Sequence, residues 1–124
     1  MRILIDTHIL LWCLEDSPKL AAAARQLIKD PDNEIYVSNA TAWEIEIKRM
    51  LGKLTIADDF MEQIEEGFCW LPIELRHIKE LRTLPSIHRD PFDRMLVAQA
   101  KCESMTLLSH YDILPQYGDF VRKV

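Results

Sequence analysis

The chain of 124 residues has the length of a single globular domain, residues 1–124, and its 48% hydrophobic and 28% charged residues are typical of a soluble fold. A net charge of −5 argues against a protein that coats nucleic acid nonspecifically, and the three scattered glycines exclude a Walker loop and a GxGxxG dinucleotide site. The three cysteines form no C-x-x-C pair and indicate buried, reduced thiols; no apolar run approaches the roughly 20 residues needed to cross a bilayer, so we expect a cytoplasmic protein.

The first element is a short apolar run over residues 2–5 that stops at Asp6. It predicts a buried parallel strand, and the apolar residues 9–14 predict a helix after it. Ligands bind beyond the carboxyl ends of parallel strands, so we expect Asp6 at the mouth of a site. The alternative is that Asp6 only caps the following helix, a position where Asp is favoured.

The next two elements are a helix over Lys19–Lys29 and a strand over Glu34–Ser38. For the helix, Ser17 is the expected N-cap and Pro18 the first helical residue, and its apolar residues recur at spacings of three and four. The strand is rich in β-forming residues and ends, like the first, at polar residues.

A further helix is predicted from Thr41 to about Leu51, before a glycine. We expect it to bury Trp43, Ile47, Met50 and Leu51. Glu44 and Lys48 lie four residues apart and share a face, which is consistent with a surface ion pair. Glu44 nevertheless follows a strand end at the same level of the fold as Asp6, so we favour a role for Glu44 in the site.

The middle of the chain predicts an amphipathic helix over Ile56–Gly67, a short edge strand over Phe68–Ile73 and a helix over Leu75–Leu84. In the first of these helices, Phe60, Ile64 and Met61 are expected inside, and the acidic residues form its solvated face.

The last third of the chain begins with Asp90-Pro91, which predicts a helix start with Asp90 as N-cap. Asp93 falls in the first turn, where the helix dipole favours an anion. A strand over Thr106–Ser109 follows, and Phe120–Val124 is expected to add an edge strand. Strands alternating with helices predict an α/β fold with a parallel sheet and helices on both faces.

Carboxylates gathered at one end of a sheet repel each other by about 4 kcal/mol per close pair. A fold that keeps them charged therefore needs a cation, and oxygen-only ligands favour Mg²⁺ or Mn²⁺. Such a site supports attack of water on a phosphodiester. Basic residues are available to hold a phosphate backbone beside it, although each is equally explained as solvated surface: Lys48, Arg49, Lys53, Arg89 and Arg94.

Three motifs resemble those of PIN-domain ribonucleases, and most of all the VapC-like toxins of type II toxin-antitoxin systems. They are Ile5-Asp6-Thr7-His8 with Leu11-Trp12, then Ser38-x-x-Thr41-x-Trp43-Glu44-Ile45-x-Ile47-Lys48, and the run from Asp90 to Ala100. The resemblance spans essentially the whole chain. It implies a three-layer α/β/α sandwich around a parallel sheet of about five strands, Mg²⁺ or Mn²⁺ dependence, cleavage of RNA, a homodimer and a cognate antitoxin.

The resemblance also implies residue roles. Asp6, Glu44 and Asp93 would be the catalytic metal ligands, Asp90 the adjoining cap, and Thr7 and Ser38 supporting polar groups. The family usually has a fourth acid after the fourth strand; here that position holds Tyr111, with Asp112 one place later. We therefore expect a site of three acids.

Two other functions remain open from the sequence. One is a noncatalytic module whose acidic pocket binds a basic partner peptide. The other is a DNA nuclease, because the metal chemistry serves either sugar.

Overall fold

The computed structural model describes all residues, 1–124. Five strands form one sheet in the order β3-β2-β1-β4-β5, and every neighbouring pair is parallel. The strands are β1 (Arg2–Ile5), β2 (Glu34–Ser38), β3 (Cys69–Leu71), β4 (Thr106–Ser109) and β5 (Val121–Lys123). All five predicted strands are thus confirmed, with β3 and β5 at the two edges as expected.

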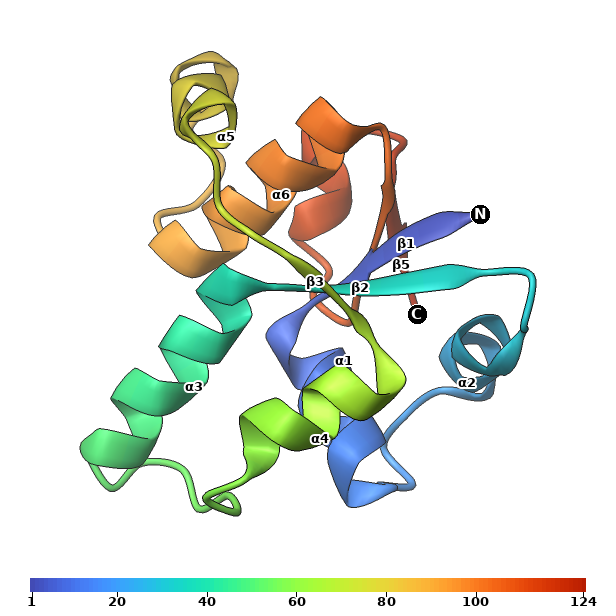
Figure 1. The fold of residues 1–124 in the computed structure, drawn as a ribbon. Helices are drawn as coiled ribbons and strands as arrows, with labels where there is room; N and C mark the ends of the chain where they lie inside the picture. Colours follow the sequence, from blue (N-terminus) through green and yellow to red (C-terminus); the bar gives the residue numbers. More distant parts are fainter.

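Helices cover both faces of the sheet. They are α1 (Thr7–Glu15), α2 (Ala22–Lys29), α3 (Asn39–Met50), α4 (Phe60–Gly67), α5 (Leu75–Glu80) and α6 (Pro91–Glu103), with short 3-10 turns over Leu81–Thr83 and Leu114–Tyr117. In Figure 1 the sheet lies between α5 and α6 above and α1, α2 and α4 below. The predicted three-layer α/β/α architecture is therefore confirmed.

The central strand β1 shows how the sequence builds these layers. Successive side chains of a strand point to opposite faces. Accordingly, Ile3 and Ile5 enter the core cluster shared with α1, α2 and α4, whereas Leu4 enters the cluster shared with α6. Because β1 is covered on both faces, it reads as a continuous apolar run.

The α2 helix begins later than predicted. Ser17 is not its N-cap: α2 starts at Ala22 with Ala21 as the capping residue, and the Ser17 hydroxyl accepts a hydrogen bond from the Lys19 amide at 3.2 Å. Ser17 instead starts a single turn that ends at Leu20, whose side chain is buried. The predicted helix over Leu75–Leu84 likewise ends as an α-helix at Glu80 and continues as a 3-10 turn.

The predicted buried side of α3 is wrong. Trp43, Met50 and Leu51 are 61%, 79% and 63% exposed, and the helix instead buries Ala40, Thr41, Ala42, Glu44 and Ile45. Polar residues occupy this inner face because it borders the strand ends, where Thr41 and Glu44 meet other polar groups. Trp43 lies outside, edge-on to Phe92 with ring centroids 5.3 Å apart.

Two smaller predictions on burial also need correction. In α4, Phe60 and Ile64 are buried as expected, but Met61 is 38% exposed. The three cysteines are free, yet Cys69 is exposed on the edge strand β3 and the other two are only half-buried. None of the helices has the length and apolar character that crossing a membrane requires.

Candidate metal and nuclease site

The carboxyl ends of β1, β2 and β4 lie side by side, and α3 and α6 begin next to each other beyond them (Figure 1). Asp6 follows β1, Ser38 ends β2 and Ser109 ends β4. The side chains that the sequence singled out therefore reach this edge of the sheet from elements far apart in the chain.

Asp6 is fully buried and accepts three hydrogen bonds. Its Oδ1 accepts from the Ile9 amide at 2.9 Å, which makes Asp6 the N-cap of α1, and its Oδ2 accepts from the Ser109 hydroxyl at 2.7 Å and the His110 amide at 3.3 Å. Burial raises the pKa of Asp6, and these hydrogen bonds oppose that rise. Asp6 thus combines the two positions considered from the sequence: it caps α1, and it lies at the carboxyl end of β1.

Glu44 is only 6% exposed, so its contact with Lys48 is not an ordinary surface pair. Lys48 Nζ lies 2.8 Å from Oε2, and the Thr7 hydroxyl donates to Oε1 at 2.6 Å. Thr7 comes directly after Asp6 and lies 3.3 Å, oxygen to oxygen, from Thr41. A short chain of hydroxyls therefore fixes Glu44 beside the end of β1.

Asp93 lies in the first turn of α6, whose N-cap Asp90 accepts from the amides of Phe92 at 2.9 Å and Asp93 at 3.1 Å. The predicted cap is thus confirmed. The Asp93 carboxylate itself accepts no hydrogen bond, and His88 Nε2 lies 3.5 Å from its Oδ2.

Burial raises the pKa of Asp93 to about 7, and the negative charges of Asp90, Asp6 and Glu44 add to the rise. The structure therefore brings the three acids named from the sequence near enough to repel one another. They do not enclose a common point: no three Asp, Glu, His or Cys side chains stand close enough together to hold one ion. Shared binding of a cation would therefore require these side chains to move closer together.

The fourth acid of the family pattern has no counterpart at this edge. Asp112 has a side chain 89% exposed and pairs with Lys123 at 3.0 Å. Tyr111 takes the place instead: burial, followed by the charges of Asp93, Asp6 and Glu44, raises the pKa of its hydroxyl to about 12. That hydroxyl bonds to the ring of His8.

Sequence reasoning named His8 within the first motif but gave it no role. Its polar side chain in the first turn of α1, two places after Asp6, was the available signal. Ser38, expected to support the acids, instead donates its hydroxyl to Gln99 at 2.5 Å and accepts from the Ala40 amide at 3.0 Å. It therefore fixes the start of α3 against α6.

The basic residues divide into paired and unpaired groups. Lys48 pairs with Glu44, and Arg49 pairs with Glu46 and Asp58. Lys53, Arg89 and Arg94 make no ion pair. Only the unpaired group has its charge free for an external anion.

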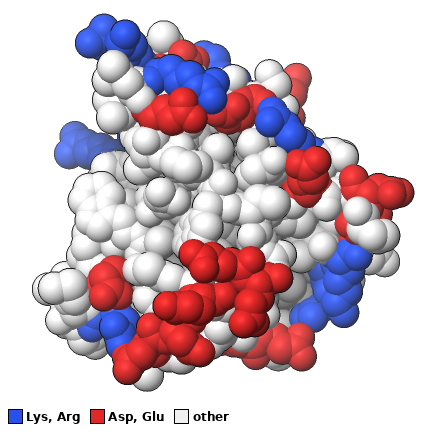
Figure 2. All heavy atoms as spheres, viewed as in Figure 1, with Lys and Arg blue, Asp and Glu red and all other residues white.

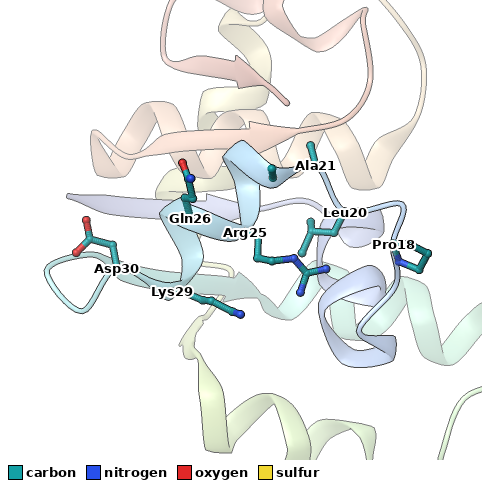
Figure 3. Close-up of a pocket in the computed structure, with 8 residues that line it drawn as sticks. Pro18, Leu20, Ala21, Arg25, Gln26, Lys29 and Asp30 are labelled. Carbon is teal, nitrogen blue, oxygen red and sulfur yellow. The ribbon is translucent and has the colours of Figure 1, made fainter.

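The largest cavity, of about 990 Å³, lies elsewhere (Figure 3). It runs along α2. Its lining residues include Leu20, Arg25, Gln26 and Lys29, but none of the three acids. Its size therefore does not mark the chemistry. The clustering of buried carboxylates at the strand ends is the stronger indication of a site.

The donor set at the strand ends fits a hard divalent cation. Its members are carboxylates, with hydroxyls bonded to two of them. Oxygen ligands favour Mg²⁺ or Mn²⁺ over zinc, which prefers nitrogen and sulfur. Asp93 carries the unmet acceptor capacity that such a cation would satisfy.

Fold and site together define a parallel α/β domain with acids gathered where the central strands end. The family model described as PIN domain matches residues 3–114, so the chain belongs to the PIN-domain family. PIN domains are generally nucleases. No curated protein matches the sequence.

Solved structures share the fold at low sequence identity. A chain of VapBC2 from Rickettsia felis, bound to a DNA fragment from their promoter, is 12% identical with a TM-score of 0.74, over 100% of this chain and 99% of that one. A chain of a toxin-antitoxin complex from Klebsiella pneumoniae is 14% identical with a TM-score of 0.69, and the match covers 98% of this chain and 99% of that one. A chain of FitAcB from Neisseria gonorrhoeae is 19% identical with a TM-score of 0.60, and the match covers 88% of this chain and 87% of that one.

Proposed function

We propose that the chain is a Mg²⁺- or Mn²⁺-dependent endoribonuclease and the toxin of a toxin-antitoxin pair. The observation that carries this proposal is the state of Asp93. Its carboxylate is half-buried, repelled by three other acids and bonded to no donor. A bound cation would remove the repulsion and satisfy the free oxygens of Asp93. It would therefore explain the clustered acids, which packing alone does not explain.

In this proposal Asp6, Glu44 and Asp93 hold the cation. When bound, Mg²⁺ or Mn²⁺ supplies activation of the attacking water and neutralisation of charge at the phosphate. Ser109 and the His110 amide orient Asp6, and Thr7 orients Glu44. Outer hydrogen bonds of this kind hold metal ligands in place and are important for affinity.

No side chain is evident as a dedicated general base. The proton of the attacking water passes to a carboxylate or to solvent. While Asp93 holds the cation it is not that acceptor, because its raised pKa of about 7 belongs to the metal-free protein and a carboxylate must be deprotonated to bind a metal.

The proposed partners are an antitoxin and a second copy of this chain. Structures of the same fold come from VapBC2, from a toxin-antitoxin complex and from FitAB bound to DNA, which supports an antitoxin here. The exposed Trp43, Met50 and Leu51 give apolar surface for either partner. RNA rather than DNA is the proposed substrate.

The test uses the purified full chain with labelled RNA and DNA strands of the same sequence, in EDTA and then with Mg²⁺ restored. We expect cleavage of RNA that depends on Mg²⁺. Loss of an outer partner of a metal ligand typically costs about 10- to 100-fold; Asp6→Asn and Asp93→Asn, which remove a ligand, should therefore lower the rate at least about 100-fold.

Both variants should stay folded, because Asn keeps the size of Asp, still caps α1 at position 6 and removes repulsion at position 93. Asp6→Asn or Asp93→Asn with wild-type cleavage at saturating Mg²⁺ would show that the assignment is wrong. Faster cleavage of the DNA strand would make the protein a DNA nuclease. Binding of a basic peptide without cleavage of either strand would favour the noncatalytic module.

A further inference from the structure

A second polar pocket adjoins the acidic site on the segment that leads into α6. Its volume is about 540 Å³, and it is lined by Ser86, Ile87, His88, Arg89 and Arg94. Two of these five residues are arginines and a third is a histidine. The pocket is therefore built for a different kind of group from the acidic site beside it.

His88 connects the pocket to the acids. Its Nε2 lies 3.5 Å from Asp93 Oδ2, and its Nδ1 lies 2.7 Å from the Tyr117 hydroxyl. Arg94 Nη1 donates to that same hydroxyl oxygen at 3.0 Å, so the hydroxyl proton is free to bond to His88 Nδ1. The imidazole of His88 therefore lines the pocket and also faces Asp93.

Arg94 is held in place by neutral groups. Its Nη1 also donates to the Pro85 carbonyl at 2.9 Å, and its guanidinium carbon lies 6.0 Å from the centre of the Tyr117 ring. No carboxylate pairs with it. The remaining donors of a planar, permanently charged group are thus left for a ligand.

Arg89 is exposed and makes neither an ion pair nor a side-chain hydrogen bond. Asp90, its neighbour in the chain, is engaged as the cap of α6. Two arginines therefore lie within a few residues of Asp90 and Asp93 without pairing with either. Their charge is available to an anion from outside the protein.

We propose that this pocket binds a phosphate of the RNA strand next to the one that is cleaved, with Arg89 and Arg94 as its cationic contacts. This inference rests on the proposed ribonuclease function. Guanidinium groups match the oxygens of a phosphate and bind it by paired hydrogen bonds. Contacts to backbone phosphates fix the register of a strand without reading its bases.

The charge distribution of the protein favours such a contact. Acidic side chains crowd over α4 in Figure 2, where Glu62, Glu65 and Glu66 are exposed, and that face repels a polyanion. The strand ends are acidic as well. An RNA strand that enters the site therefore needs cations beside it. Arg89 and Arg94 supply them in the pocket, which is separated from Asp93 by the side chain of His88.

The test measures binding of a short, labelled, mixed-sequence single-stranded RNA by fluorescence anisotropy, in EDTA and over a range of KCl concentrations. Each phosphate contact contributes about 0.7 to the slope of log affinity against log salt for single strands. We expect Arg89→Ala to weaken binding several-fold and to reduce the slope by about 0.7. Arg89→Lys, which keeps the charge, should restore the slope.

The matched control is Lys19→Ala, which removes one exposed, unpaired cation beyond the far end of α1. It should bind RNA as wild type does. Thermal unfolding of Arg89→Ala should match wild type, because the side chain has no bonded partner to lose. Wild-type affinity and salt slope for Arg89→Ala, or an equal loss for Lys19→Ala, overturn the inference.

Because binding is measured without cleavage, the two proposals fail separately. An active wild-type ribonuclease whose RNA binding is insensitive to Arg89→Ala overturns the phosphate pocket alone. A wild-type chain that never cleaves RNA, but whose binding and salt slope depend on Arg89, overturns the ribonuclease and keeps the pocket.

Discussion

Asp6 and Asp93 lie at the same edge of the sheet, but their carboxylates differ in burial and in hydrogen bonding. Asp6 is fully buried, and its carboxylate accepts three hydrogen bonds. Asp93 is half-buried, accepts none, and has a pKa raised to about 7 by burial and by the neighbouring acids. One carboxylate is already satisfied by the protein, and the other is not.

The difference assigns the two acids different roles in folding. Asp6 is part of the scaffold, because it caps α1 and ties the end of β1 to the end of β4. At Asp93 the repulsion by the neighbouring acids offsets the favourable position of a negative charge at the start of α6, as expected of a group kept for function. Substitution should therefore lower the free energy of unfolding much more at Asp6 than at Asp93, even though both should abolish cleavage.

The largest difference should appear between Asp6→Ala and Asp93→Ala in EDTA. Asp6→Ala removes the helix cap and leaves the Ser109 hydroxyl without its acceptor, so we expect a loss of about 2 kcal/mol in the free energy of unfolding. Asp93→Ala removes the repulsion by the neighbouring acids together with the favourable position of a negative charge in the first turn of α6, so we expect little net change. Urea unfolding measures both, and equal losses would contradict the distinction.

A smaller effect is expected where the protein satisfies Glu44. Thr7→Val keeps the shape of the side chain but removes the hydroxyl that donates to Glu44 Oε1, so the unfolding free energy should fall by about 1–2 kcal/mol. Affinity for Mg²⁺ should fall as well, because Glu44 loses its orientation. Thr7→Ser, which keeps the hydroxyl, is the control, and isothermal titration with Mg²⁺ gives the affinities. A Thr7→Val protein as stable as Thr7→Ser would show that this hydrogen bond is dispensable.

The pH dependence of stability sharpens the comparison further. An unfolded Asp has a pKa near 3.8, whereas folded Asp93 titrates at about 7, so the folded protein binds the extra proton between these values. The contribution of Asp93 to the unfolding free energy therefore falls as pH rises from about 4 to about 7. Partial exposure to solvent reduces its size.

Thermal unfolding of wild type and Asp93→Asn in EDTA, at several pH values, isolates this contribution, since Asp6 is unchanged in both proteins. We expect the wild-type midpoint to decline more steeply over this range. Mg²⁺ affinity of wild type should rise over the same range, because a carboxylate must lose its proton to bind a cation. Parallel midpoint curves would place the titration on another group.

Much of the fold was predictable because local signals agreed with the tertiary structure. The central strands β1, β2 and β4 are short apolar runs that end at polar residues, and Asp90 before Pro91 marks the start of α6. A parallel sheet then follows, and it places the ends of β1, β2 and β4 together. The sheet accounts for Asp6 at a strand end, whereas Asp93, on α6, was grouped with Asp6 through the resemblance to PIN-domain ribonucleases.

The orientation of α3 could not be predicted in the same way. Periodicity favours burial of large apolar residues, yet Trp43 is exposed and Glu44 is buried. The reason is a tertiary contact: the Thr7 hydroxyl, from the turn after β1, satisfies the Glu44 carboxylate. The hydrogen bond of Tyr111 to His8 joins residues 103 positions apart in sequence, so it too was out of reach of local pattern.

The smallest expected effect concerns Asp112, the acid that stands next to the place of the family's fourth carboxylate. Its side chain is 89% exposed and pairs with Lys123, and exposed pairs contribute at most about 1 kcal/mol. Asp112→Asn should therefore change neither the unfolding free energy, beyond about 0.5 kcal/mol, nor the Mg²⁺ dependence of RNA cleavage. Lys123→Met, which removes the other partner, is the matched control. If Asp112→Asn alone raised the Mg²⁺ concentration needed for cleavage, the loop after β4 would have to move Asp112 into the site during the reaction, and the site would contain four acids rather than three.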